Sequence, residues 1–258
     1  MAVLSVDLAF RRWSDLGIVI IDGPRQPHSP LNCEIFPSLA QDDLPGPVDA
    51  NILAGRLNHL CAVRGIRLMM LDGPQAWKSR SNGLAHARVS ERQLNTAAKT
   101  GLPGMVKPIT YRSFAEFCLD LYDALCRRGW RRLEARDQPG SPQDQNQEPV
   151  LVESYPYAAW KSLGVKPLPS KRRARVSDLA EAFGALRSLI PITTNRPPNH
   201  DQLQAIVGGL PGLALEEHNP AGARIVGNPP RREEGHWREG YIVLPLPPAR
   251  TIGLRWLN

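Results

Sequence analysis

Residues 67–71 (RLMML) constrain the fold most, because every residue after the first is apolar and no polar residue alternates with them. Strands of this kind are buried on both faces, as they are in a parallel sheet. The segment follows a helical apolar pattern over 48–63, which Gly65 ends. Before that helix, the apolar runs 2–8 and 16–22 favour a hairpin. Hairpin, helix and buried strand in this order predict a mixed α/β sheet that gains a parallel strand through a right-handed crossover.

The rest of the chain alternates helical and strand patterns, which extends this interpretation to a single domain over residues 1–258. Residues 31–47 favour a loop, with only weak support for a strand at 34–36, and the polar segment 136–149 is predicted to be a mobile loop. The remaining predicted elements are helices over 82–99, 112–128 and 176–189, strands over 150–153 and 241–244, a short helix after Tyr155, and a helix that begins with the capping box Asn199–Gln202 and ends near Gly208 and Gly209.

Composition and charge restrict the partner and the compartment. The formal net charge of +7 favours an anionic partner, of which phosphate backbones are the most common. No apolar run reaches the roughly 20 residues of a membrane-spanning helix. The N-terminus does not resemble a signal peptide, so we expect a cytoplasmic protein. The four cysteines lack the pair spacing of zinc sites, and we expect buried free thiols.

Four acids stand where an α/β fold places its chemistry. Asp7, Asp72 and Glu153 each end an apolar strand, and Asp201 lies in the first turn of its helix. Neighbouring parallel strands bring such acids to one sheet end, where open α/β sheets bind ligands. Because buried like charges repel, a divalent cation between them resolves the conflict, and the four acids together could supply a two-metal site. The alternative is an ordinary strand-end or turn acid and, for Asp201, an acid that stabilises the helix dipole.

Two groups of basic residues could contact a phosphate backbone. These are a run downstream of the third acid, Lys171, Arg172, Arg173 and Arg175, and a pair one helical turn apart, Arg88 and Arg92. A solvated basic surface is the alternative for the run, and pairing with the acids of the site is the alternative for the pair. Trp130, inside a further basic cluster, could stack on a base, although core burial is the favoured interpretation.

The order of several short motifs resembles a known family. The motifs are Val-Asp7, then Leu-Asp72-Gly-Pro, then Glu153-Ser-Tyr-Pro, then His200-Asp201-Gln-Leu-Gln-Ala, together with an arginine-and-acid segment from Ala87 to Arg92 and the ending from Gly240 to Pro245. In order and spacing they resemble the uncharacterised predicted nucleases of the ribonuclease-H-like superfamily, a domain-of-unknown-function family. The resemblance spans most of the chain.

This resemblance implies a ribonuclease-H-like mixed sheet with helices on both faces. It also implies that Asp7, Asp72, Glu153 and Asp201 bind Mg²⁺ or Mn²⁺ and serve the hydrolysis of phosphodiester bonds in DNA or RNA. Family members usually have their last acid just before the residue equivalent to Ala205, where this chain has Gln204. A catalytically impaired nucleic-acid-binding module of the same fold therefore stays open, as does a phosphoesterase that acts on small molecules.

Overall fold

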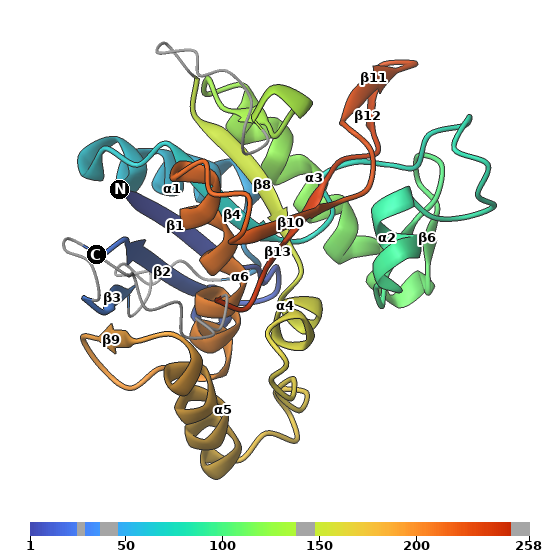
Figure 1. The fold of residues 1–258 in the computed structure, drawn as a ribbon. Coiled ribbons are helices and arrows are strands. Elements are labelled where there is room, and N and C mark those ends of the chain that lie inside the picture. Colours follow the sequence, from blue (N-terminus) through green and yellow to red (C-terminus); the bar gives the residue numbers. More distant parts are fainter. Residues whose placement is uncertain (25–28, 37–45, 138–147, 249–258) are drawn as a thin grey trace, which may run out of the picture.

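The computed structural model describes residues 1–24, 29–36, 46–137 and 148–248. Its main sheet consists of β1 (Ala2–Asp7), β2 (Gly17–Asp22), β3 (Leu31–Phe36), β4 (Leu68–Asp72), β7 (Arg131–Arg132), β8 (Val150–Ser154), β9 (Ile192–Thr194), β10 (Ala223–Val226) and β13 (Ile242–Pro245). The strand order is β10-β13-β8-β4-β1-β2-β3-β9 (Figure 1). Strand β7 pairs with β8 outside this order.

The centre of the sheet has the predicted mixture of strand directions. Strand β2 is antiparallel to β1 and to β3, whereas β4 is parallel to β1 and β8 is parallel to β4. Met69 and Met70, neighbours in β4, belong to hydrophobic cores on opposite faces of the sheet. The hairpin, the parallel crossover and the strand buried on both faces are therefore confirmed.

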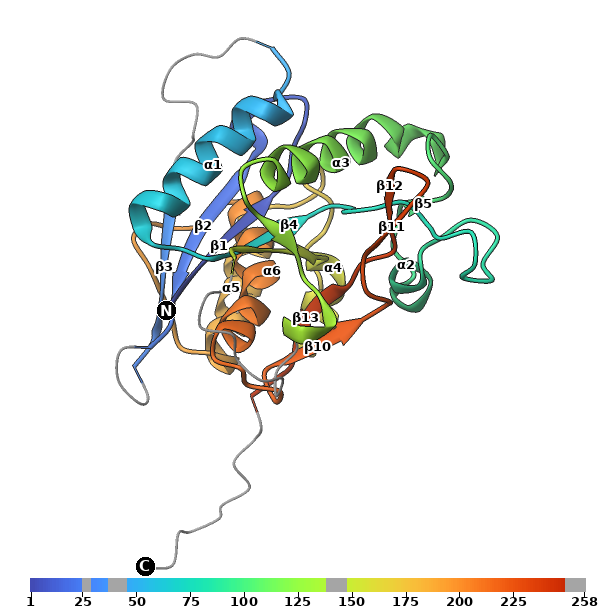
Figure 2. The same ribbon diagram turned by 90° about the horizontal axis from the view of Figure 1, so that it is seen from above.

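Helices cover both faces of this sheet. On one face lie α1 (Ala50–Arg64) and α3 (Arg112–Cys126), and on the other lie α4 (Pro156–Ser162), α5 (Val176–Leu189) and α6 (His200–Glu216), as Figure 2 shows. The short α2 (Val89–Leu94) lies to one side, near the ribbons β5–β6 (Lys99–Thr100, Val106–Lys107) and β11–β12 (Arg231–Glu233, His236–Arg238). This architecture confirms the predicted mixed α/β class and is consistent with a ribonuclease-H-like fold. Among the described residues, no helix combines the length and apolar character needed to cross a membrane.

Two helix limits confirm the signals in the sequence. Gly65, after α1, has φ of 64°, the left-handed conformation in which glycine is favoured. At the start of α6, the Asn199 side chain accepts from the Gln202 N–H, and the Gln202 side chain accepts from the Asn199 N–H, both at 2.9 Å. This is the predicted capping box.

Helix α6 does not end at Gly208 and Gly209, as the sequence suggested, but continues to Glu216. The glycines are there because the helix lies directly on the sheet: a Cβ on Gly209 would come within 2.5 Å of the Ser5 side chain. The Ser5 hydroxyl in turn donates a hydrogen bond of 2.6 Å to the Ala205 carbonyl of the helix. Close helix–sheet packing, rather than helix termination, explains the glycine pair.

The predicted helix over 82–99 is also wrong, since only Val89–Leu94 is helical. The preceding loop is held by the fully buried carboxylate of Glu239, which accepts from the backbone N–H of Ser79 and of Val89 at 2.8 Å and from the Asn82 side chain at 2.6 Å. These bonds come from a residue far along the chain, so a local pattern could not predict them.

Among the remaining predictions, one loop proved to be a strand, whereas the predicted burial of Trp130 and of most cysteines is confirmed. Residues 31–36 form the strand β3 rather than a loop, with Cys33 and Ile35 alternating into the core. Trp130 is buried, and its indole donates to Asn58, as core packing requires. Three of the cysteines are buried free thiols, and Cys126 is partly exposed. Most of the predicted loop 136–149 lies outside the described residues.

Candidate metal and phosphate site

Asp7 and Asp72 lie directly opposite each other at one end of the sheet. They are paired in register as the last residues of the neighbouring parallel strands β1 and β4. A hydrogen bond joins the two carboxyl groups. Both side chains are only partly buried by area, yet they lie deep enough to lose most of their hydration. The register of two strands is therefore what brings this pair of acids together.

The two carboxyl groups cannot both ionise easily. Burial raises the pKa of Asp7 well above its ordinary value of 3.8, and the charges of Asp72 and Asp201 raise it further. Burial also raises the pKa of Asp72 from 3.8 to about 7; the hydrogen bond from Asp7 opposes this rise, and the charge of Glu153 adds to it. Both carboxyl groups therefore hold their protons more tightly than ordinary aspartates do. A positive charge nearby favours release of these protons, and the charge of Lys171 already lowers the pKa of Asp7.

Asp201 approaches this pair from the first turn of α6, and its residue is only 5% exposed. The helix crosses closely over Gly17, where a Cβ would overlap the Asp201 carbonyl group, and Gly17 is the strand partner of Asp7. The Lys171 ammonium donates to the Asp201 carboxylate and, at 2.8 Å, to that of Asp15. Asp201 is therefore close enough to raise the pKa of Asp7, but its own charge is balanced by Lys171.

Glu153 is one residue out of step with the pair. In the register between β4 and β8, Asp72 lies opposite Ser154, and Leu71 lies opposite Glu153. Because successive side chains of a strand point to opposite faces, Glu153 points away from the face that carries Asp72. The Arg88 guanidinium donates two hydrogen bonds to the Glu153 carboxylate, at 2.6 and 2.7 Å. Glu153 thus points to the other face of the sheet and pairs with an arginine, although its charge still raises the pKa of Asp72 and both residues line the same pocket.

Arg88 is the centre of a buried network that sequence reasoning largely missed. It is 1% exposed and also donates to Glu91 at 3.1 Å. Glu91 accepts further bonds from the backbone N–H of Thr100 at 2.9 Å and from its hydroxyl at 2.7 Å. The backbone N–H of Gln75 donates to Glu153 at 3.1 Å. Arg88 therefore pairs with acids, and while it does so it is not accessible to a phosphate from outside.

The donor set at the sheet end fits a divalent cation in part. Asp7 and Asp72 offer two carboxylates whose repulsion a cation would relieve, and magnesium typically uses one or two carboxylates together with substrate phosphate oxygens and water. Within the ranges that the structure describes, no three His, Cys, Asp or Glu side chains are grouped so that they could hold an ion. The described residues therefore assemble a pair of acids with Asp201 as a neighbour, rather than a cluster of four.

Gln204, the residue in place of the usual last acid, is directed elsewhere. Its side-chain oxygen accepts a hydrogen bond of 2.7 Å from the indole N–H of Trp160 in α4. Gln204 therefore links α6 to α4 and is not directed toward the carboxyl group of Asp7.

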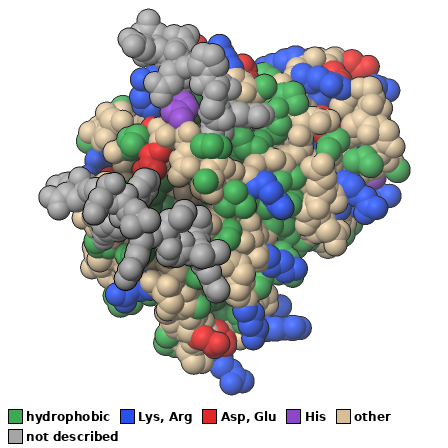
Figure 3. All heavy atoms as spheres, in the orientation of Figure 1, with side chains coloured by type: hydrophobic (Ala, Val, Ile, Leu, Met, Phe, Trp, Pro, Cys, Tyr) green, Lys and Arg blue, Asp and Glu red, His purple; other side chains and the backbone are tan. Residues whose placement is uncertain are grey.

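The predicted basic run lies at the surface close to Asp201. Its members are exposed in the turns before α5, and they are Lys171, Arg172, Arg173 and Arg175. Figure 3 shows Lys and Arg side chains along the lower right of the drawn face, below α4 in the orientation of Figure 1. Arg92 is exposed as well, in contrast to Arg88. Through Lys171, this surface is joined to the acid site.

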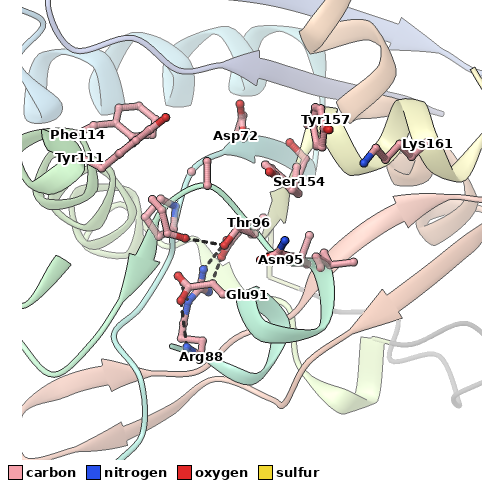
Figure 4. A pocket seen from close by; sticks show the side chains of 18 residues that line it. Asp72, Arg88, Glu91, Asn95, Thr96, Tyr111, Phe114, Ser154, Tyr157 and Lys161 are labelled. Carbon is pink, nitrogen blue, oxygen red and sulfur yellow. Dashed lines mark hydrogen bonds and ion pairs between the residues drawn. The ribbon is translucent and has the colours of Figure 1, made fainter. Parts of the chain in front are cut away.

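A pocket of about 580 Å³ opens beside Asp72 and was not anticipated from the sequence. It is lined by aromatic rings from two sides, Tyr111 and Phe114 near the start of α3, and Tyr155 and Tyr157 near the start of α4. In Figure 4, Asp72 and Ser154 lie between the Tyr111–Phe114 side and the Tyr157–Lys161 side. The Tyr-Pro-Tyr segment that begins two residues after Glu153 was the signal in the sequence that could have indicated this pocket.

Comparisons with known proteins add little to this geometry. No family model and no curated protein matches the chain. A solved structure of RuvC from Thermus thermophilus is similar over 81% of this chain and 91% of its own, at 13% sequence identity and a TM-score of 0.34. A likeness at this level carries no argument about activity, which has to rest on the residues themselves.

Proposed function

We propose that this protein hydrolyses phosphodiester bonds in nucleic acid with the help of a Mg²⁺ or Mn²⁺ ion held by Asp7 and Asp72. The observation that carries the proposal is the pair of half-buried aspartates that lie opposite each other at the ends of two parallel strands, both with raised pKa values. Such a pair destabilises the folded protein at neutral pH unless a cation accompanies it. Functional sites are where such costs are commonly retained.

The residues of the chain divide the work between them. Asp7 and Asp72 would hold the cation, which when bound supplies Lewis acidity toward the phosphate and makes a water molecule more acidic. Asp201 lies close enough to orient a water molecule or to complete the ligand set, once Lys171 exchanges its carboxylate for a phosphate oxygen. The exposed basic run from Lys171 to Arg175 would attract the phosphate backbone. Glu153 would join the ligands only if Arg88 released it.

Cleavage assays with conservative variants test this proposal. The wild-type protein should cut DNA or RNA in the presence of Mn²⁺ and not in EDTA, and Asp7→Asn and Asp72→Asn should each abolish cleavage. The matched control is Asp22→Asn, because Asp22 also ends a strand but lies at the opposite end of the sheet, opposite Ala2. Cleavage that survives both site substitutions would contradict the proposal.

A second candidate is a nucleic-acid-binding module without hydrolysis. It is favoured by two hydrogen bonds: Glu153 accepts from Arg88, and Gln204 accepts from Trp160. The side chains at two positions where the family resemblance expects metal ligands are therefore already bonded within the protein. Binding with a steep salt dependence but without metal-dependent cleavage would support it.

The small-molecule phosphoesterase alternative predicts instead the hydrolysis of a chromogenic phosphate ester, a substrate that the nuclease proposal does not require.

A further inference from the structure

We propose that the pocket beside Asp72 binds an unpaired nucleotide of a single-stranded nucleic acid, with its base against the aromatic walls. The inference deepens the proposed function and rests on it, because the adjoining phosphate would lie at the Asp7–Asp72 pair. Asp72 and Ser154 both line the pocket, so the acid site and the aromatic walls are continuous.

The walls present flat apolar surfaces to a ligand. Tyr111 is 39% exposed and Tyr157 is 47% exposed, although both are large and partly apolar. The rings of Tyr155 and Tyr157 are 6.1 Å apart between centroids, so the second wall is a pair of rings rather than a single one. Aromatic side chains of this kind bind bases by stacking, which every base allows because each has two flat faces.

Stacking in the pocket distinguishes an unpaired base from a paired one. In a duplex the faces of each base are covered by its neighbours, whereas the bases of single strands, loops and ends can be splayed out onto a protein. The volume of about 580 Å³ lies within the range of small-ligand pockets, roughly 300–1,000 Å³. It accommodates a nucleotide and excludes a double helix.

The charges around the pocket suit a strand with phosphates. The Lys161 ammonium lies 4.4 Å from the centre of the Tyr157 ring and is exposed, so it can meet a phosphate next to a stacked base. Glu91 and Glu153 also line the pocket, but Arg88 bonds both of them. The single charge of Arg88 balances one of these two glutamates, and the charge of Lys161 balances the other, so the two cations of the wall match its two glutamates.

Binding assays in EDTA test this proposal separately from cleavage. The probes are a fluorescent single strand of mixed sequence, the same sequence folded as a hairpin duplex, and an abasic strand of equal length, which keeps the phosphates and lacks the bases. The variants are Tyr157→Ala and Tyr157→Phe. The control is Val176→Ala, because Val176 is 83% exposed on α5, outside the pocket.

The expected result is preferential binding of the single strand, weakened about tenfold or more by Tyr157→Ala and little changed by Tyr157→Phe or by the control. Binding of the duplex and of the abasic strand should be weaker and insensitive to Tyr157→Ala. Equal binding of the single strand and the duplex, absence of binding to any probe, or equal effects of Phe and Ala at position 157 would each overturn the proposal.

The same set of proteins keeps the two proposals distinguishable. If Mn²⁺-dependent cleavage is lost in Asp7→Asn while Tyr157→Ala leaves binding unchanged, the acid site is right and the pocket assignment is wrong. If single-strand binding depends on the Tyr157 ring while no cleavage occurs, the pocket is right and the hydrolytic function is wrong.

Discussion

Replacement of Asp72 by asparagine should stabilise the metal-free protein, and it should do so only at higher pH. Asparagine has nearly the shape of a protonated aspartic acid and cannot ionise. In the folded wild-type protein, burial raises the pKa of Asp72 to about 7, whereas its ordinary value in an unfolded chain is 3.8. The difference in free energy of unfolding between the two proteins therefore depends on pH, because over this range only the folded wild type keeps the Asp72 proton.

The sign and size follow from the two pKa values. Below pH 3.8 the side chain is protonated in both states, and the wild type loses no stability. From there to about pH 7 the unfolded chain releases the proton while the folded protein keeps it, so the free energy of unfolding falls by about 1.4 kcal/mol per pH unit. The wild type should therefore be less stable than Asp72→Asn by about 2 kcal/mol near pH 5 and by up to about 4 kcal/mol near pH 8.

Urea denaturation in EDTA, followed by tryptophan fluorescence at these two pH values, measures the difference. The control Asp22→Asn should change the stability by no more than about 0.5 kcal/mol at either pH, as surface substitutions usually do. The reasoning is refuted if Asp72→Asn is no more stable than the wild type near pH 8, or if its gain is the same at both pH values.

Three further predictions concern the surroundings of the pair. Arg88→Met should lower the free energy of unfolding by about 3–5 kcal/mol, because it leaves two buried glutamates unpaired. The control Arg92→Met, at an exposed position, should have little effect. Equal losses of stability for the two variants in urea denaturation would contradict this prediction. Gly209→Ala should destabilise the protein by about 1–3 kcal/mol through overlap with β1. Gly184→Ala in α5, where a Cβ meets nothing within 4 Å, should be neutral or stabilising. A Gly184→Ala protein less stable than Gly209→Ala would be incompatible with the close packing of α6 on the sheet. The affinity for Mn²⁺, measured by calorimetry, should rise by up to about tenfold per pH unit below about pH 7, since Asp72 with its pKa of about 7 must lose its proton before it binds the ion. A profile that is flat below pH 7 would exclude this pair as the ligand.

The central fold could be predicted because its signals are local. The apolar run before Asp72 can be satisfied only by a strand buried on both faces, and a parallel partner then fixes the sheet end at which its acid lies. The Asn199 capping box is likewise formed by residues three apart. In such cases sequence neighbours determine the structure.

The features that the sequence could not predict depend on residues distant in sequence. The pairing of Glu153 with Arg88 depends on the register between β4 and β8, because a shift by one residue turns every side chain of a strand to the other face. Gly209 resembles a helix stop until the sheet beneath it is known. The loop before α2 is shaped by Glu239, which lies about 150 residues later in the chain.

If Asp7 and Asp72 share one divalent cation, a crystal soaked in Mn²⁺ and measured at the manganese absorption edge should locate it between them. We expect an anomalous peak within about 2.2 Å of a carboxylate oxygen of each aspartate, close to the distances of hard divalent ions. An absence of such a peak at millimolar Mn²⁺ above pH 8, or a peak on other acids while these two keep their protons, would contradict a cation shared by this pair.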